Sequence, residues 1–289
     1  MVCLGRHREF TLPARQPRIG ASFGPMNRNN FAGKILMALA IETHQLTRFF
    51  DDFCAVDAIE LRVERGTFYG FLGPNGAGKS TTIKMLTGLL APTEGEVLVL
   101  GKDMLNARDA LEAKSKMGVI PEDLALFDNL TAREYLTFVG RMHLLPRDTI
   151  RSRIDELLPL LGLESDEKKL TLEYSHGMKK KLALAAALLP NPDLLFLDEP
   201  FEGVDAVTSR VIRDLLKGYV ARGSTVFLTS HVLEIVEKLC THVGIIVKGR
   251  LVDQDSLDGI RQGSSLEDRF LERAGADSVA IPTISWLEE

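Results

Sequence analysis

One segment combines glycines, a lysine and two hydroxyl side chains at a spacing that can hold phosphate groups. It fits the pattern G-x-x-x-x-G-K-[ST] between an apolar, strand-like stretch and a helix-like one, the context that gives the pattern meaning. Gly73, Gly76 and Gly78 are expected to adopt left-handed backbone angles that turn N–H groups toward one anion, beside the positive dipole end of the next helix. Lys79 would then reach the β- and γ-phosphates of a nucleotide, and Ser80 a Mg²⁺ ion. The expected phosphate-binding residues are Gly73, Pro74, Asn75, Gly76, Ala77, Gly78, Lys79, Ser80 and Thr81.

Two adjacent acids, Asp198 and Glu199, follow an apolar run at residues 194–197. Such a run is typical of a strand buried on both faces of a parallel sheet. At its carboxyl end, beside the phosphate-binding segment, Asp198 would hold Mg²⁺ through water and Glu199 would act as the general base that polarises an attacking water. Taken alone, two acids after an apolar run are more often a strand meeting solvent. Together with the phosphate-binding segment they predict a P-loop NTPase.

Between these two signals, residues 174–178 resemble the signature of the ATP-binding subunits of ABC transporters. The family's signature is Leu-Ser-Gly-Gly-Gln, and this chain keeps Ser175 and Gly177 but differs at the other three places. The resemblance implies that Ser175 and Gly177 contact the γ-phosphate of ATP bound by a second subunit, so that hydrolysis needs a head-to-tail dimer enclosing two ATP molecules. Ser175 also suits the N-cap of an amphipathic helix, and the two roles are compatible.

Further positions match landmarks of the family in the expected order. The resemblance places Asp205 in the loop that contacts the partner subunit. It places His231, at the end of a β-rich strand, where it would orient the γ-phosphate and the attacking water, which makes His231 and Glu199 the expected catalytic residues. Phe50 matches the aromatic residue that stacks on adenine, a contact worth ~1–3 kcal/mol. The alternative is that the neighbouring Phe49 or Phe53 fills the core.

Glu122 departs from the family pattern, because most relatives carry a glutamine at its place. A carboxylate oxygen could still ligate Mg²⁺, but it adds negative charge beside the phosphates, and that repulsion must be offset. An ordinary solvated acid after Pro121 is an equal alternative. Glu122 and the altered signature together resemble the exporter-type branch of the family, whose separate membrane subunits move drugs, lipids, polysaccharides or ions outward.

The resemblance implies an α/β fold: a P-loop NTPase core with a mixed, largely parallel sheet flanked by helices, an antiparallel β subdomain and a helical signature subdomain. We expect a disordered leader over 1–36, where six Lys/Arg face only one acid. The ABC nucleotide-binding domain is expected over 37–271, with the helical subdomain at about 122–190, and a C-terminal tail over 272–289. Strands are expected at 41–47, 59–65, 67–72, 97–100, 194–197 and 225–229, and helices at 79–90, 131–139, 154–161, 180–189, 206–222 and 266–271.

Composition limits the possible partners. No stretch of the 289 residues approaches the ~18 consecutive apolar residues of a membrane helix. An integral membrane transporter subunit is therefore the expected partner, with a homodimer or a related ATPase subunit forming on ATP binding, at the cytoplasmic face of the membrane. The net charge of −5 disfavours nucleic acid. A soluble ABC-type ATPase that acts on a macromolecular partner is the alternative function, although such proteins usually carry two modules or a long coiled coil.

Overall fold

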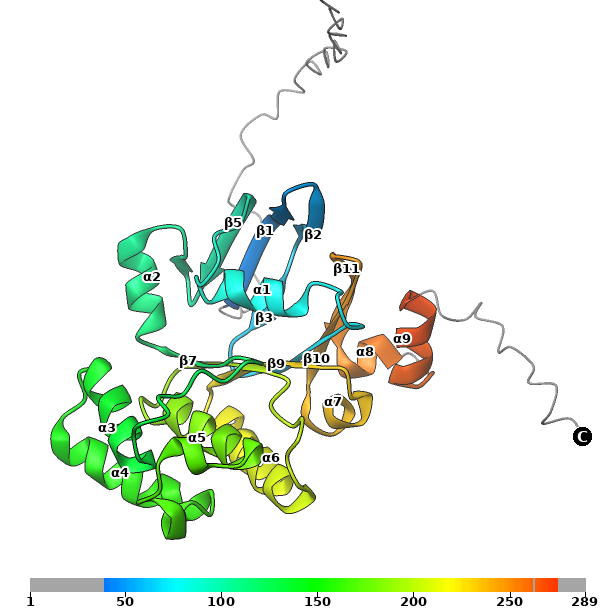
Figure 1. The fold of residues 1–289 in the computed structure, drawn as a ribbon. Coiled ribbons are helices and arrows are strands. Elements are labelled where there is room, and N and C mark those ends of the chain that lie inside the picture. Colours follow the sequence, from blue (N-terminus) through cyan, green and yellow to red (C-terminus); the bar gives the residue numbers. More distant parts are fainter. Residues whose placement is uncertain (1–38, 262, 275–289) are drawn as a thin grey trace, which may run out of the picture. The chain divides into compact units, whose positions relative to one another are not determined.

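A six-stranded sheet forms the centre of the fold in the computed structural model, which describes residues 39–261 and 263–274 (Figure 1). The expected leader over 1–36 lies outside the described residues, and so does the tail from residue 275 onward. The strand order is β11-β10-β4-β9-β8-β7. The bounds are β4 (Phe68–Leu72), β7 (Met117–Ile120), β8 (Leu194–Asp198), β9 (Thr225–Ser230), β10 (His242–Val247) and β11 (Arg250–Ser256).

The sheet is parallel except for β11, which pairs antiparallel with β10 at one edge. Strands β4, β8 and β9 are buried along their whole length, as their continuous apolar runs predict. Register places Leu72 beside Ser230, and Asp198 beside Thr229. Three adjacent strands therefore end side by side, and the segments that follow them start from one edge of the sheet. This confirms the predicted P-loop core.

A second, antiparallel sheet has the order β2-β1-β5-β6, and β3 also pairs with β1. Its strands are β1 (Leu39–Phe50), β2 (Phe53–Ile59), β3 (Arg62–Glu64), β5 (Glu94–Val99) and β6 (Lys102–Asp103). The single strand predicted at 59–65 is wrong, because the chain crosses between two pairings with β1 there. Thr43 marks the crossing: its hydroxyl donates to the Ile59 carbonyl at 2.8 Å and accepts from the Leu61 N–H at 2.9 Å.

The helices pack on both faces of the central sheet. In Figure 1, α1, α2 and the antiparallel sheet lie on one side of it, and α3 to α6 lie on the other. The helices are α1 (Lys79–Leu86), α2 (Ala107–Lys114), α3 (Ala132–Met142), α4 (Arg147–Leu160), α5 (His176–Leu188), α6 (Ala206–Ala221), α7 (Leu233–Leu239), α8 (Leu257–Arg261) and α9 (Leu266–Ala274). None of the helices in the described ranges is both long and apolar enough to cross a membrane.

Local signals placed some helices well and others poorly. The capping box of α3 is present as predicted, with Thr131 and Glu134 satisfying each other's backbone N–H groups. Helix α1 ends at Leu86 rather than 90, because Gly88 takes a left-handed φ of 66°. Helix α4 begins at Arg147, well before the predicted start. Helix α2 was not predicted, because it buries only alanines and so lacks a strong apolar period.

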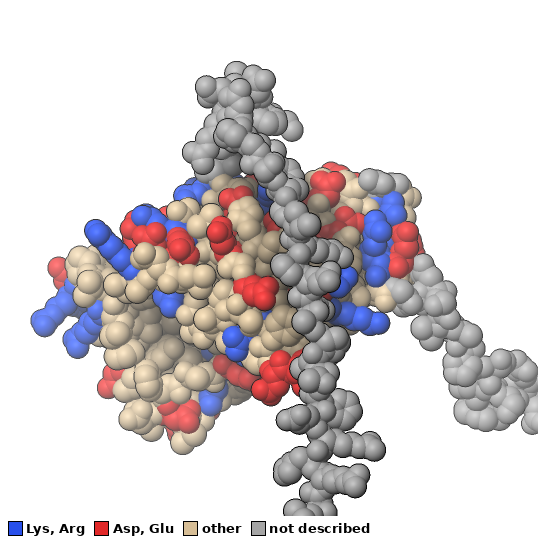
Figure 2. All heavy atoms as spheres, turned by 90° about the horizontal axis from the view of Figure 1, so that it is seen from above, with Lys and Arg blue, Asp and Glu red and all other residues tan. Residues whose placement is uncertain are grey.

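Charged side chains of both signs are interspersed over the face that Figure 2 draws. Much of that face is neither basic nor acidic, which is usual for a folded domain. The distribution of charge on this face therefore singles out no partner.

Candidate nucleotide-binding site

A cavity of about 570 Å³ collects most of the predicted site residues. It lies where β4, β8 and β9 end, with the β1–β2 hairpin at its side. Its lining residues are Phe50, Phe53, Ala55, Asn75, Gly76, Gly78, Lys79, Ser80, Thr81, Glu122, Glu199, Glu202 and His231. Lys79 is the only lysine or arginine among them, and three of them are glutamates. Among the charged side chains of the cavity, Lys79 is therefore the one that favours an anion.

The phosphate-binding segment runs from β4 to α1 and forms the floor of this cavity. Gly76 and Gly78 adopt left-handed φ angles of 77° and 108°, as predicted. A Cβ on Gly78 would also lie 2.6 Å from the carbonyl oxygen of Ala55. Gly73 differs from the prediction, because its φ is not left-handed. This position needs glycine for a steric reason, since a Cβ there would lie 2.5 Å from the Ile246 carbonyl oxygen.

Lys79 is the first residue of α1, and its side chain is folded back over its own loop. It is only 7% exposed, and its Nζ donates to the carbonyl oxygens of Gly73 at 2.8 Å and Pro74 at 3.2 Å. These two hydrogen bonds position the ammonium group at the floor of the cavity. A phosphate group that enters can replace them with a charge-assisted contact.

The acidic pair at the end of β8 is held by Thr229 of β9. The Thr229 hydroxyl donates to Asp198 Oδ1 at 2.5 Å and accepts from the backbone N–H of Glu199 at 3.1 Å. Asp198 and Glu199 are both buried, at 4% and 8% exposure. Glu199 Oε1 lies 3.0 Å from Nδ1 of His231, so the structure brings the two predicted catalytic side chains into contact. His231 is partly exposed, and it reaches Glu199 from the end of β9.

Glu122 lies in the cavity, next to the hydroxyl of Ser80. Ser80 Oγ donates to Glu122 Oε2 at 3.2 Å, which joins two of the three predicted metal-binding residues. Within the described part of the chain, no group of three His, Cys, Asp or Glu side chains could hold a metal ion alone. The oxygen donors of Ser80, Asp198 and Glu122 still fit Mg²⁺, which prefers hard oxygen ligands. This ion commonly takes only one or two carboxylates, and waters and phosphates complete its shell.

Ser175, Gly177 and Asp205 do not line this cavity. Ser175 caps α5, with its side-chain oxygen accepting from the Met178 N–H at 3.3 Å. Asp205 caps α6 and accepts from the N–H of Thr208 at 2.9 Å and its hydroxyl at 2.6 Å. These hydrogen bonds, the hydroxyl first, lower the pKa of the Asp205 carboxyl. The predicted N-cap of the signature helix is thus confirmed, and the γ-phosphate contact of Ser175 stays a prediction.

The aromatic residues of the β1–β2 hairpin lie at the side of the cavity. Phe50 and Phe53 line it and are 43% and 64% exposed, while Phe49 is 40% exposed. The alternative that Phe49 or Phe53 fills the core is therefore wrong. The guanidinium carbon of Arg48 lies 4.7 Å from the centre of the Phe50 ring, so one face of that ring is already occupied.

Sequence reasoning missed several residues of the site. Thr229 is the only one with a local signal, a hydroxyl within an apolar strand two residues before the predicted His231. Phe53 and Ala55 reach the cavity because β2 pairs with β1, and Glu202 because of the turn after β8. Neither arrangement has a signature in spacing.

Comparisons with known proteins agree with this geometry. The ABC transporter family matches residues 56–202. The chain is 37% identical over 229 residues to the probable multidrug ABC transporter ATP-binding protein YbhF of Escherichia coli K12, covering 79% of this chain but only 39% of that protein. It is 38% identical over 227 residues to the bacitracin transport ATP-binding protein BcrA of Bacillus licheniformis, covering 78% and 72%.

Solved structures share the fold. An ATP-binding subunit of an ABC transporter superposes with a TM-score of 0.77 at 28% identity, over 81% of this chain and 99% of that one. A dimeric bacterial ABC transporter cassette superposes with a TM-score of 0.70 at 25% identity, over 75% and 98%. The chain belongs to the ABC transporter family, as a protein with the fold and the phosphate-binding segment of its ATP-binding subunits.

Proposed function

We propose that the protein is an ATP-hydrolysing subunit that dimerises on ATP and drives export through a separate membrane subunit. One observation carries the proposal. Lys79, Ser80, Glu199 and His231 share one cavity, while the signature residue Ser175 lies outside it. A site that is complete only when a second subunit supplies Ser175 explains both facts. The names of the relatives, which include bacitracin transport and multidrug proteins, support an exporter.

In this proposal the predicted site residues have distinct tasks. Lys79 and the backbone of the phosphate-binding segment bind the phosphates of ATP. Ser80, Asp198 and Glu122 would hold Mg²⁺, which supplies charge neutralisation at the phosphates when bound. Glu199 accepts the proton of the attacking water, and His231, 3.0 Å from it, orients that carboxylate and the water. From the partner, Ser175, Gly177 and Asp205 would close the site over the γ-phosphate.

The same geometry supports a role for Phe50 in binding the base. One face of its ring carries Arg48, and an adenine would stack on the other. Phe50→Ala is expected to weaken ATP binding by ~1–3 kcal/mol, or roughly 5- to 150-fold in dissociation constant, because one base–aromatic contact is lost. Titration with a fluorescent ATP analogue measures it. Phe49→Ala, in the next position but outside the cavity, is the matched control, and an equal effect of both variants would contradict the assignment.

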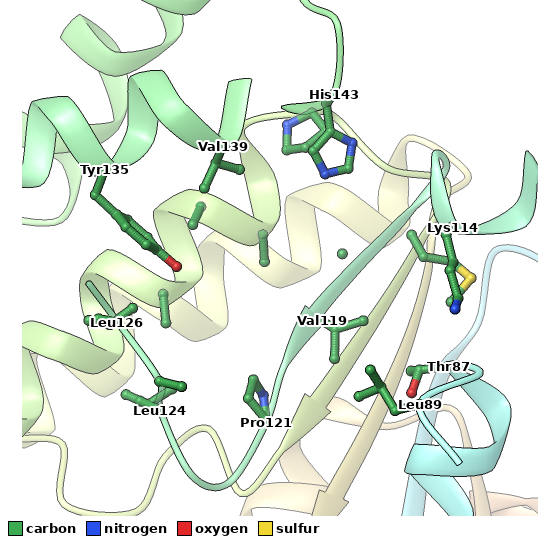
Figure 3. A pocket seen from close by; sticks show the side chains of 17 residues that line it. Thr87, Leu89, Lys114, Val119, Pro121, Leu124, Leu126, Tyr135, Val139 and His143 are labelled. Carbon is green, nitrogen blue, oxygen red and sulfur yellow. The ribbon is translucent and has the colours of Figure 1, made fainter. Parts of the chain in front are cut away.

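A second cavity, of about 400 Å³, supports the proposed membrane partner. It lies between α3, α5 and β7, and it is lined mostly by apolar side chains (Figure 3). Tyr135 and Val139 of α3 face Val119 and Leu124 across it. The segment from Pro121 to Leu124, which follows β7 directly, also contains Glu122 of the nucleotide-binding cavity. We infer that a short helix of the membrane subunit docks here, so that its movement reaches the nucleotide through Glu122. In this proposal the protein acts at the cytoplasmic face of the membrane.

Leu89 gives a test of that docking site. It lines the second cavity and is 69% exposed, so Leu89→Asp should fold normally and place a charge where an apolar helix binds. We expect the variant to lose co-purification with the membrane subunit while ATP binding stays unchanged. Leu111→Asp is the matched control, since Leu111 is 72% exposed on α2 and lies outside the cavity. Co-purification of a soluble macromolecule in place of a membrane protein would favour the alternative function.

A further inference from the structure

Helix α5 carries a lysine that points inward and not to solvent. Lys180 is only 5% exposed, and its Nζ donates to the backbone carbonyls of Glu199 at 3.0 Å and Glu202 at 2.5 Å. Both acceptors belong to the segment between β8 and α6. Burial lowers the pKa of Lys180, an effect that the nearby carboxylates of Glu202 and Glu199 partly oppose. A buried lysine is costly unless its donors are satisfied, so its contacts define its role.

Glu199 has an unusual backbone conformation. Its φ is 47°, in the left-handed region that residues other than glycine rarely adopt. Surrounding groups must hold such a conformation, and here two side chains do so. Thr229 of β9 accepts from its N–H at 3.1 Å, and Lys180 of α5 donates to its carbonyl. The Glu199 carbonyl also accepts from the Glu202 N–H at 3.3 Å, within the same turn. Lys180 and Thr229 are the two side chains that hold Glu199 from other elements.

We propose that Lys180 is a positioning residue that fixes the general base Glu199 and ties it to the signature helix of the same chain. The inference rests on the proposed function. Ser175 caps the amino end of α5 and would bind the ATP of the partner, whereas Glu199 acts on the ATP of its own chain. Lys180 joins these two through one rigid helix. A movement of α5 on engaging the partner's ATP thus reaches Glu199 directly, which couples the two ATP sites.

A second contact supports this link between α5 and the segment after β8. Gly203 has a left-handed φ of 67°, and a Cβ there would lie 3.0 Å from Cδ2 of His176, the first residue of α5. The helix therefore lies against this segment at its amino end as well as at Lys180. The segment after β8 is therefore in contact with α5 at two separate points.

The test compares Lys180→Met with Lys180→Gln in the full-length chain. Methionine keeps an unbranched apolar stem but has no donor, so kcat for Mg-ATP should fall about 10- to 100-fold, the effect of a general base displaced by ~1 Å. ATP affinity should stay within about twofold, because Lys180 does not line the cavity. Glutamine offers two N–H donors for the two carbonyls and should restore kcat to within about fivefold of wild type. Lys217→Met, an exposed lysine of α6, controls for loss of charge and should match wild type.

A readout other than hydrolysis separates positioning from a merely structural role. In a Glu199→Gln background, Lys180→Met should leave ATP-dependent dimer mass unchanged, because binding does not need the base. Loss of ATP affinity in both Lys180 variants, or a wild-type kcat in Lys180→Met, would overturn the inference. If Glu199→Gln alone hydrolyses ATP at the wild-type rate, the proposed function fails instead, so the two failures are distinguishable.

Discussion

Lys79→Ala is expected to reduce ATP binding below detection and to abolish hydrolysis. A charge-assisted hydrogen bond contributes ~1.5–3 kcal/mol, which alone is roughly a 10- to 150-fold change in affinity. The loss here is larger because Lys79 is the only lysine or arginine in the lining of the cavity, which also contains Glu122, Glu199 and Glu202. Without Lys79 the phosphates of ATP would face three carboxylates, offset only by Mg²⁺ and by the backbone N–H groups of the phosphate-binding segment.

Equilibrium binding of a fluorescent ATP analogue to the purified chain measures this effect. Lys84→Ala is the matched control, since Lys84 lies on the same helix α1 and is exposed. A melting curve should accompany both variants, because Lys79 also donates to the carbonyls of Gly73 and Pro74 and its removal takes that donor from both. A folded Lys79→Ala protein with wild-type affinity would end the assignment of the phosphate-binding segment.

The core of the site could be predicted because its determinants are local. The phosphate-binding segment is continuous in sequence, and each buried strand of the central sheet is a short apolar run that ends in polar residues. Parallel strands end at a common edge, so Asp198 and Glu199 were expected near Lys79, while His231 was expected there from the family resemblance. The contact between Glu199 and His231 follows from β8 pairing with β9.

The parts that could not be predicted depend on contacts between distant segments. Thr43 redirects the chain between β2 and β3 through hydrogen bonds to residues far along the sequence, so the bounds of those strands have no local signal. Gly73 has the expected residue type for a different reason, the close approach of Ile246 in β10. Lys180 resembles any other lysine of a basic run in the sequence, and only the packing of α5 on the segment after β8 turns it inward.

Glu199→Gln is expected to bind ATP, form a closed dimer and hydrolyse ATP at least 100-fold more slowly than wild type. Glutamine keeps the size of the side chain but removes the carboxylate that accepts the proton of water, and general-base catalysis typically contributes 10²–10⁴-fold. ATP should therefore persist between Lys79 of one subunit and Ser175 of the other. In light scattering with Mg-ATP the variant should have twice the monomer mass, and it should return to monomer with ADP.

A second substitution tests whether Ser175 closes the site from the partner. Ser175→Arg in the Glu199→Gln background should block ATP-dependent dimers, because the long side chain fills the space of the phosphate. Ser175 also caps α5, and loss of a cap costs ~1 kcal/mol, so Ser175→Ala is the control that removes the cap without adding bulk. The alanine variant should still dimerise, at higher ATP concentration. Each measurement is best repeated with the membrane subunit, since an isolated subunit can associate too weakly to detect. Rapid hydrolysis by Glu199→Gln, or dimers that tolerate Ser175→Arg, would show that ATP is hydrolysed within a single subunit.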